Sequence, residues 1–536
     1  SDFARRHRLE KADPSAAVSE AVEPIVYYLD RGVPEPVRSA LLDGARWWAQ
    51  AFEAAGYKDA YRVEILPEGV DPMDVRYNVI QWVHRSTRGW SYGSSVLDPR
   101  TGEILKGHVS LGSLRVRQDY LIAEGLLAPY DSASVPPAML EMSLARIRQL
   151  SAHEVGHTLG FEHNFAASTQ DRSSVMDYPF PLVRITEDGD LDLSNAYDVG
   201  IGEWDKRTVL YAYQDFPDGV DRAAARQQIM DETIAAGFKY VADADSRAVG
   251  TSHPDGNLWD NGADALAELE HIMQVREIAL QRMSERSVRI GKPLASIEET
   301  LVPIYLLHRF QIRAVGKLIG GQYFQYRLRG DAQADANPVA VARQQQAIDA
   351  LLATMDPSVL RLPQDLVDTI TPRVPNNPKS RETFSGSTGV NFDALEPARS
   401  AVALTLEVLL DPSRAARLER AESLGFDAIA QGLMNASWYA KPRQGVDAAI
   451  QRQTNMQVLY GLLALAFSEH VDVDVRARAY TTVVELREWL SRRGPNDRSL
   501  RAQFRFAEHE IQRLMDNPEA INKRVPTIVP PGSPIG

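Results

Sequence analysis

The chain has 536 residues, of which 44% are hydrophobic and 24% charged, a composition typical of a protein with one or more large buried cores. Its formal net charge of −13 leaves no basic surplus to neutralise phosphates, so we expect no nucleic-acid partner. The absence of cysteine excludes disulfides, thiolate metal ligands and a cysteine nucleophile.

Neither end of the sequence carries a recognisable membrane or export signal. The longest apolar run, residues 459–467, is too short to cross a bilayer, so no membrane span is predicted. The N-terminal residues lack the apolar core of a signal peptide. Because the chain does not begin with Met, we interpret it as processed or truncated and expect any export signal to lie upstream.

The first part of the chain predicts an α/β arrangement. Runs of β-branched and aromatic residues between turn signals are typical of strands, and the expected strands are residues 25–29, 61–66, 77–83, 94–97 and 103–112. A helix is predicted to begin after Pro36 and to end at Gly56. The last two strands indicate a hairpin. The glycine-bearing second strand, residues 103–112, is an equal candidate for an ordinary hairpin strand and for a sheet edge that pairs with an extended peptide substrate.

A second helix pattern, after another around residues 115–127, ends in the motif H-E-x-x-H-x-x-G-x-x-H. His153 and His157 lie one helical turn apart, so both imidazoles project from the same face and can bind one metal ion. Glu154 is placed to hold a water molecule on that metal. Gly160 lets the backbone leave the helix and turn back to present His163. Three neutral imidazoles with one open position are typical of a catalytic zinc site. The apolar stripe of this helix is expected to be core and comprises Leu140, Leu144, Ile147 and Leu150.

Two other metal arrangements are less favoured by the sequence. A glutamate from a later helix is an alternative third ligand, but Glu187 lies in a turn rich in Gly and Asp. Residues 255–264 are dense in oxygen ligands, yet their spacing misses the EF-hand pattern. We therefore favour a loop that caps a helix starting at Ala265 over a calcium or substrate site, and Trp259 is a candidate for lining the cleft.

Beyond residue 222 the pattern is mainly helical. The expected helices are residues 227–235, 265–286, 294–319, 339–352, 395–410, 455–469 and 475–492. Residues 321–328 predict an isolated strand. The stretch 371–389, rich in Pro and Asn, indicates an internal linker or long loop.

The motif HEVGHTLGFEH followed by SVMDY at residues 174–178 resembles the metzincin zinc endopeptidases. The resemblance implies Glu154 as the general base and Met176 as the hydrophobic floor of the site. It implies three zinc ligands, His153, His157 and His163. Tyr178 stands where astacin-like and serralysin-like metzincins place a tyrosine that reaches the zinc or the oxyanion. A packed tyrosine without such a role is the alternative.

The wider run, including SVMDYP, DPRTGEILKG and the helical C-terminal part, resembles large exported bacterial zinc-dependent metalloproteases. This implies an α/β (α+β) catalytic domain with a twisted mixed sheet and an active-site helix, followed by a mostly α-helical region. It also implies a periplasmic, outer-membrane-associated or secreted protein. The expected parts are an N-terminal segment 1–20, a metzincin-like catalytic domain 21–215, helical regions 216–375 and 376–525, and a Pro-rich tail 526–536.

The predicted function is hydrolysis of peptide bonds in peptide or protein substrates, by a zinc-bound water activated by Glu154. Two alternatives remain open. One is a non-catalytic, zinc-stabilised scaffold that binds partners, although such a scaffold would not need Glu154. The other is a peptidase restricted to small peptides. The oligomeric state is not predicted by the sequence.

Overall fold

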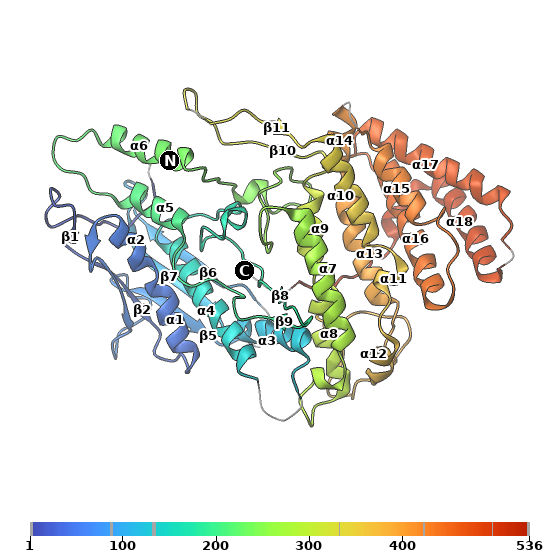
Figure 1. The fold of residues 1–536 in the computed structure, drawn as a ribbon, viewed down its shortest axis with the longest axis horizontal. Coiled ribbons are helices and arrows are strands. Elements are labelled where there is room, and N and C mark those ends of the chain that lie inside the picture. Colours follow the sequence, from blue (N-terminus) through green and yellow to red (C-terminus); the bar gives the residue numbers. More distant parts are fainter. Residues whose placement is uncertain are drawn as a thin grey trace.

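The computed structural model describes residues 4–85, 89–130, 136–331, 333–421, 424–495 and 497–532. Within them, the first part is built on a five-stranded mixed sheet of order β4-β2-β5-β7-β6 (Figure 1). Its strands are β2 (Ile25–Leu29), β4 (Tyr61–Ile65), β5 (Asn78–Val83), β6 (Tyr92–Leu97) and β7 (Ile104–Gly112). Neighbouring strands are parallel except β6, which runs antiparallel to β7. The predicted hairpin is therefore confirmed. The edge of the sheet is its first strand, β6, and the expectation that the glycine-bearing second strand is an edge is wrong, because β7 pairs with β5 on one side and β6 on the other.

The helix expected between Pro36 and Gly56 is two consecutive helices, α1 (Val37–Arg46) and α2 (Trp48–Ala54). At the junction the hydrogen bonds tighten, since the N–H of Trp47 donates to the carbonyl of Gly44 at 3.1 Å, three residues back. This change of helical pitch allows Trp47 and Trp48 both to be buried.

The zinc motif ends α4 (Pro137–Thr158), which packs against α1, β6 and β7, and also against α3 (Leu114–Leu127). Its expected apolar stripe is only half right. Ile147 and Leu150 are buried, whereas Leu140 and Leu144 are partly exposed, and Met139 and Met142 are buried instead. The reason is that α4 lies between two cores, so its first turns and its last turns bury different faces.

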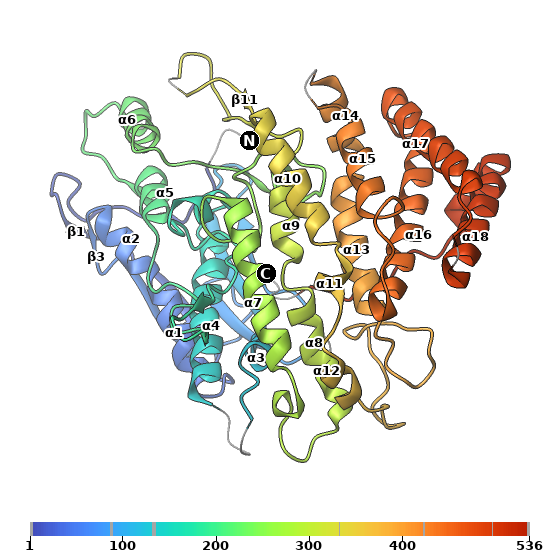
Figure 2. The same cartoon turned by 45° about the vertical axis from the view of Figure 1, so that its right-hand side comes forward.

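The rest of the chain is mainly helical, as expected. Its longer helices are α5 (Glu203–Tyr213), α6 (Arg222–Ala235), α7 (Ala265–Arg282), α8 (Ile297–Tyr305), α9 (Arg309–Gly316), α10 (Val341–Ala353), α13 (Glu396–Leu409), α14 (Pro412–Arg420), α15 (Asp427–Ala436), α16 (Gly445–Phe467), α17 (Val473–Arg492) and α18 (Arg498–Asp516). Figure 2 shows α9, α13, α16 and α17 side by side. In the described part of the chain, none of the helices combines the length and apolarity needed to cross a membrane.

Two expectations for this region are wrong. The single helix expected over residues 294–319 is divided into α8 and α9, and α8 contains Pro303, which has no N–H to continue the helical ladder. The strand expected over 321–328 is not isolated: β10 (Gln322–Tyr323) pairs antiparallel with β11 (Asn337–Pro338). Among the longer helices, α14, α15 and α18 were not expected. The sequence of α18 does carry apolar residues at helical spacing, and the missed positions are Leu500, Phe504, Ala507, Ile511 and Leu514.

The described residues form two hydrophobic cores. One joins the sheet with α1, α2 and the last turns of α4, and it includes Met176. The other joins α3 and the first turns of α4 with Tyr178, Trp259 and the helices through α18. The helical region therefore shares a core with the segment that follows the zinc motif. The domain boundaries at residues 215 and 375 stay predictions.

The stretch predicted as a linker or long loop has no helix or strand between α12 (Gln364–Thr369) and α13. It is nevertheless packed, since Phe384 is buried and the Glu382 carboxylate accepts a hydrogen bond from Arg117 of α3 at 2.7 Å. We therefore describe it as a long, packed loop.

Candidate metal centre

The three motif histidines converge through their Nε2 atoms. His163 Nε2 lies 3.2 Å from His153 Nε2 and 3.1 Å from His157 Nε2. Nitrogen ligands of a tetrahedral zinc ion, at 2.0–2.1 Å from the metal, are themselves about 3.3 Å apart. Among the described residues, this is the group of potential ligands that could hold a metal ion. The donor set and its spacing therefore fit zinc.

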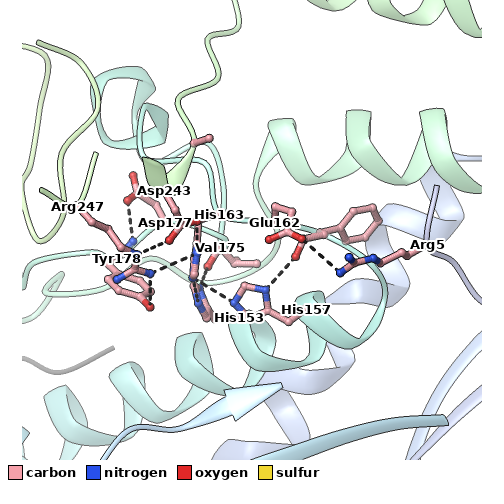
Figure 3. Close-up of polar contacts among 12 residues, drawn as sticks. Arg5, His153, His157, Glu162, His163, Val175, Asp177, Tyr178, Asp243 and Arg247 are labelled. Carbon is pink, nitrogen blue, oxygen red and sulfur yellow. Dashed lines mark hydrogen bonds and ion pairs between the residues drawn. The ribbon is translucent and has the colours of Figure 1, made fainter. Parts of the chain in front are cut away.

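The second ring nitrogen of each histidine is held by an oxygen acceptor. His153 Nδ1 lies 2.7 Å from the Val175 carbonyl, and His157 Nδ1 lies 2.9 Å from the Phe161 carbonyl. Nδ1 must carry the proton in both cases, because a carbonyl only accepts hydrogen bonds. The Nε2 lone pairs therefore face the shared centre, as a metal site requires (Figure 3).

Burial keeps these rings neutral. It lowers the pKa of His153 well below its usual value and lowers the pKa of His157 to about 4. The neighbouring imidazoles lower both further, because charging one ring would place it beside the others. Neutral imidazole is the form that binds a metal ion.

Two glycines of the motif are required by close packing. A Cβ at Gly156 would overlap the sulfur of Met176 and would lie 2.6 Å from the Trp48 ring. Gly160 has a φ of +101°, and a Cβ there would overlap the carbonyl of Arg5. The first glycine brings Met176 directly under α4, and the second lets the chain turn towards the third histidine.

A buried carboxylate holds the turn that contains Met176. Asp205, at the start of α5, accepts hydrogen bonds from Ser174 Oγ at 2.6 Å and from the Val175 N–H at 2.8 Å. Burial raises its pKa to about 7, against the effect of these bonds. Because Val175 also supplies the acceptor for His153, Asp205 orients that ligand indirectly. The position of Asp205 in the first turn of a helix could be seen in the sequence, but its contact with the methionine turn could not.

Glu154 lies beside the histidines and is 2% exposed. Burial raises the pKa of its carboxyl to about 8, opposed by the charge of Arg146 and by a hydrogen bond from the Gly93 N–H. Gly93 belongs to β6, so the free edge of the sheet runs along the metal centre. A Cβ at this glycine would overlap the carbonyl of Glu154, which explains the glycine in an edge strand.

The third histidine has a partner that sequence reasoning missed. His163 Nδ1 lies 2.9 Å from the Asp243 carboxylate, which also forms an ion pair with Arg247. Arg247 donates to the hydroxyl of Tyr178 at 3.0 Å (Figure 3). Its guanidinium lies over the ring of Phe165. Burial acts to raise the pKa of Asp243, but the bonds from His163 and Arg247 hold it at about 2. Asp243 and Arg247 are oppositely charged residues four positions apart, and this pair was the sign in the sequence that could have pointed to a partner of His163.

The segment that carries Asp243 is fastened to the metal centre by main-chain hydrogen bonds. The Phe165 N–H donates to the Val241 carbonyl at 3.0 Å, and the Trp259 N–H donates to the Tyr178 carbonyl at 2.8 Å. The rings of Tyr178 and Trp259 are 5.0 Å apart. The predicted cap of the following helix is confirmed, because Asp264 accepts from two N–H groups of α7.

The alternative metal arrangements receive no geometric support within the described residues. Glu187 lies in the turn between β8 (Arg184–Ile185) and β9 (Leu191–Asp192), outside the three-histidine group. Residues 255–264 also do not enter that group, and Asp255 instead forms an ion pair with Lys239 at 2.8 Å.

The protein has a mixed sheet packed against α4, three converging imidazoles, and a turn with Met176 beneath them. These features define a protein with a zinc-binding centre. The model of the Met-zincin family matches residues 136–441, more than half of the chain, and the chain belongs to this family. Membership implies a metallopeptidase. The match begins at the start of α4, so the sheet lies before it, and it extends over the segment that carries Asp243 and Arg247. No curated protein and no solved structure matches the chain.

Proposed function

We propose that the protein is a zinc-dependent metalloendopeptidase that hydrolyses peptide bonds in peptides or proteins. The convergence of three Nε2 lone pairs beside the Glu154 carboxylate supports this proposal most directly. His153, His157 and His163 would hold the metal. Zinc bound there would supply a Lewis acid that polarises the substrate carbonyl and lowers the pKa of a coordinated water.

Glu154 is the proton carrier in this proposal. Its carboxylate accepts a proton from the attacking water, whose oxygen bonds to the carbonyl carbon, and returns the proton to the amine as the C–N bond breaks. Burial raises the pKa of Glu154 to about 8. A divalent cation beside the carboxylate would lower that pKa and keep the base ionised in the resting enzyme.

The free edge of β6 supports binding of an extended chain. Its side chains alternate between exposed and half-buried along the strand, and its other edge pairs with β7. A substrate strand that pairs with this edge passes beside Gly93, which contacts Glu154. The edge continues beyond Gly93 to Leu97, so a substrate strand can pair over several residues on that side of the site.

Tyr178 has the role of stabilising negative charge on the reacting carbonyl oxygen. Its ring packs 4.8 Å from that of His163, and its hydroxyl accepts a hydrogen bond from Arg247, so its own proton remains available for an oxyanion. The arginine also opposes the rise in the pKa of Tyr178 that burial causes. Asp243 positions both partners, because it contacts His163 and Arg247.

The test compares the wild type with Glu154→Gln at equal zinc content on a diverse peptide pool and on an unfolded protein, read by mass spectrometry. We expect internal cuts by the wild type, and at least about a 10³-fold lower rate from the variant. Cuts confined to short peptides would identify the restricted peptidase. Silence of the zinc-loaded wild type on all substrates would reject the proposal and favour the scaffold.

A further inference from the structure

A cavity of about 1540 Å³ lies outside the metal centre, between the helical region and the segment 524–532. Helices α9, α13 and α16, which stand side by side in Figure 2, form its walls. Its size is that of a site for several residues of a polypeptide rather than for a small ligand.

The charge of the cavity is opposite to that of the protein. Its walls include one acidic residue, Glu407. Five arginines line it as well: Arg309, Arg313, Arg381, Arg399 and Arg524. Two of them have an acidic partner in α13, since Arg313 pairs with Glu407 at 3.1 Å and Arg399 with Glu396 at 2.9 Å. In a chain with a net charge of −13, this concentration of cations in a concave, partly desolvated site attracts anions. Guanidinium groups bind carboxylates in a bidentate geometry that lysine cannot provide.

Aromatic rings connect the cavity to the metal centre. Trp259 lines the cavity, and its ring lies 5.0 Å from that of Tyr178, which in turn packs on His163. Trp90, shortly before β6, also lines the cavity and lies 6.5 Å from Trp259. The segment leading into the edge strand therefore borders the cavity, and a chain that pairs with β6 is directed towards it.

The cavity walls already bind extended main chain. The segment 524–532 contains three prolines and has no helix or strand. Arg309 Nη1 donates to the carbonyl of Pro530 at 2.9 Å, and Gln457 Nε2 donates to the hydroxyl of Thr527 at 3.3 Å. These contacts show that long polar side chains of α9 and α16 bind the oxygens of the extended segment that forms another wall of the cavity.

We propose that this cavity anchors an acidic stretch of the polypeptide substrate while the bond to be cut lies at the metal centre. The inference rests on the proposed function and adds a substrate class to it. Carboxylates of the substrate pair with the cavity arginines, and its apolar residues pack on Trp90, Trp259 and Phe310. The acidic stretch lies beyond the residues that pair with β6.

The experiment uses two peptides that share one cleavable core, identified from the peptide pool, and differ in a flanking stretch of Glu or of Gln. The zinc-loaded enzyme is compared with Arg313→Gln/Arg381→Gln. The ion-pair partner of Arg313, Glu407, is 48% exposed, so water can solvate it in the variant. Arg361→Gln is the matched control, because it also breaks an ion pair, with Asp447, but does not line the cavity.

We expect the wild type to show about a 10-fold lower KM for the Glu peptide than for the Gln peptide, with similar kcat, and this preference to weaken in high salt. The double variant should lose most of the preference, and Arg361→Gln should keep it. Equal KM values for the two peptides, or the same loss in the control, would overturn the inference.

A direct binding measurement separates failure of this inference from failure of the proposed function. Fluorescence anisotropy of both peptides with zinc-loaded Glu154→Gln should show tighter binding of the Glu peptide, reduced when the two arginine substitutions are added. This preference should appear even if no peptide is cleaved. Binding without charge preference would reject the acidic anchor while leaving the peptidase intact.

Discussion

Removing the carboxylate of Asp243 should weaken zinc binding. The carboxylate accepts the Nδ1–H of His163 at 2.9 Å, which fixes the tautomer and the ring orientation and makes Nε2 a better donor to the metal. Asp243→Asn keeps an oxygen acceptor but loses the charge, whereas Asp243→Ala loses both. The two variants therefore separate the effect of orientation from that of charge.

The expected magnitude follows from this contact and its exposure. Loss of such an outer partner lowers metal affinity about 10- to 100-fold, or about 1.4–2.7 kcal/mol. Because the Asp243 side chain is 38% exposed, water can replace part of the lost interaction. We expect the lower part of the range, about 10-fold for Asn and about 30-fold for Ala.

Zinc affinity is measured by competition with a fluorescent chelator, which needs no substrate. Asp245→Asn is the matched control: it lies in the same short 3-10 helix as Asp243, but its carboxylate accepts a hydrogen bond from the Tyr326 hydroxyl at 2.8 Å instead of from His163. Affinities of both Asp243 variants within about twofold of the wild type would refute the assigned role of this carboxylate.

Three further outcomes are expected. Gly156→Ala should lower the free energy of unfolding, measured by urea denaturation, by about 1–3 kcal/mol, because the added Cβ overlaps Met176. A Gly→Ala change inside a helix usually raises the stability, and such a rise here would contradict the prediction. Burial raises the pKa of Glu268 to about 7, so between pH 5 and pH 7 the folded state keeps a proton that the unfolded chain has lost. The free energy of unfolding should therefore fall as the pH rises from 5 to 8. The fall should be about 2 kcal/mol larger in the wild type than in Glu268→Gln. Parallel pH curves would disprove that reasoning. Tyr178→Phe should lower kcat about 10-fold at unchanged zinc affinity, and a kcat equal to that of the wild type would leave the packed-tyrosine alternative.

The parts of the site that could be predicted from sequence are those defined by short spacing. His153 and His157 converge because a helix places residues four apart on one face, and Gly160 marks the turn that brings His163 back. In each case the relevant partners lie within one or two elements of one another.

The missed residues act over long sequence distances. Asp243 contacts a histidine 80 residues earlier, from a segment without apolar periodicity, so no local pattern connects the two. Helix α4 shows the same limit in its packing: its buried face changes from Met139 to Ile147 because different elements cover its two ends. Pro303 was a visible sign of the division between α8 and α9, but continuous apolar residues around it favoured one long helix.

The 80 residues that separate His163 from Asp243 in the sequence also determine the order in which the parts of the metal centre are synthesised. A growing chain exposes the complete histidine motif 80 residues before Asp243 emerges from the ribosome, and Trp259 follows later still. An incomplete chain thus has its metal ligands but lacks the segment that orients one of them and covers Tyr178. If the protein is a peptidase, its catalytic competence arrives after the motif has been made, which limits the time in which a nascent enzyme can cut neighbouring unfolded chains.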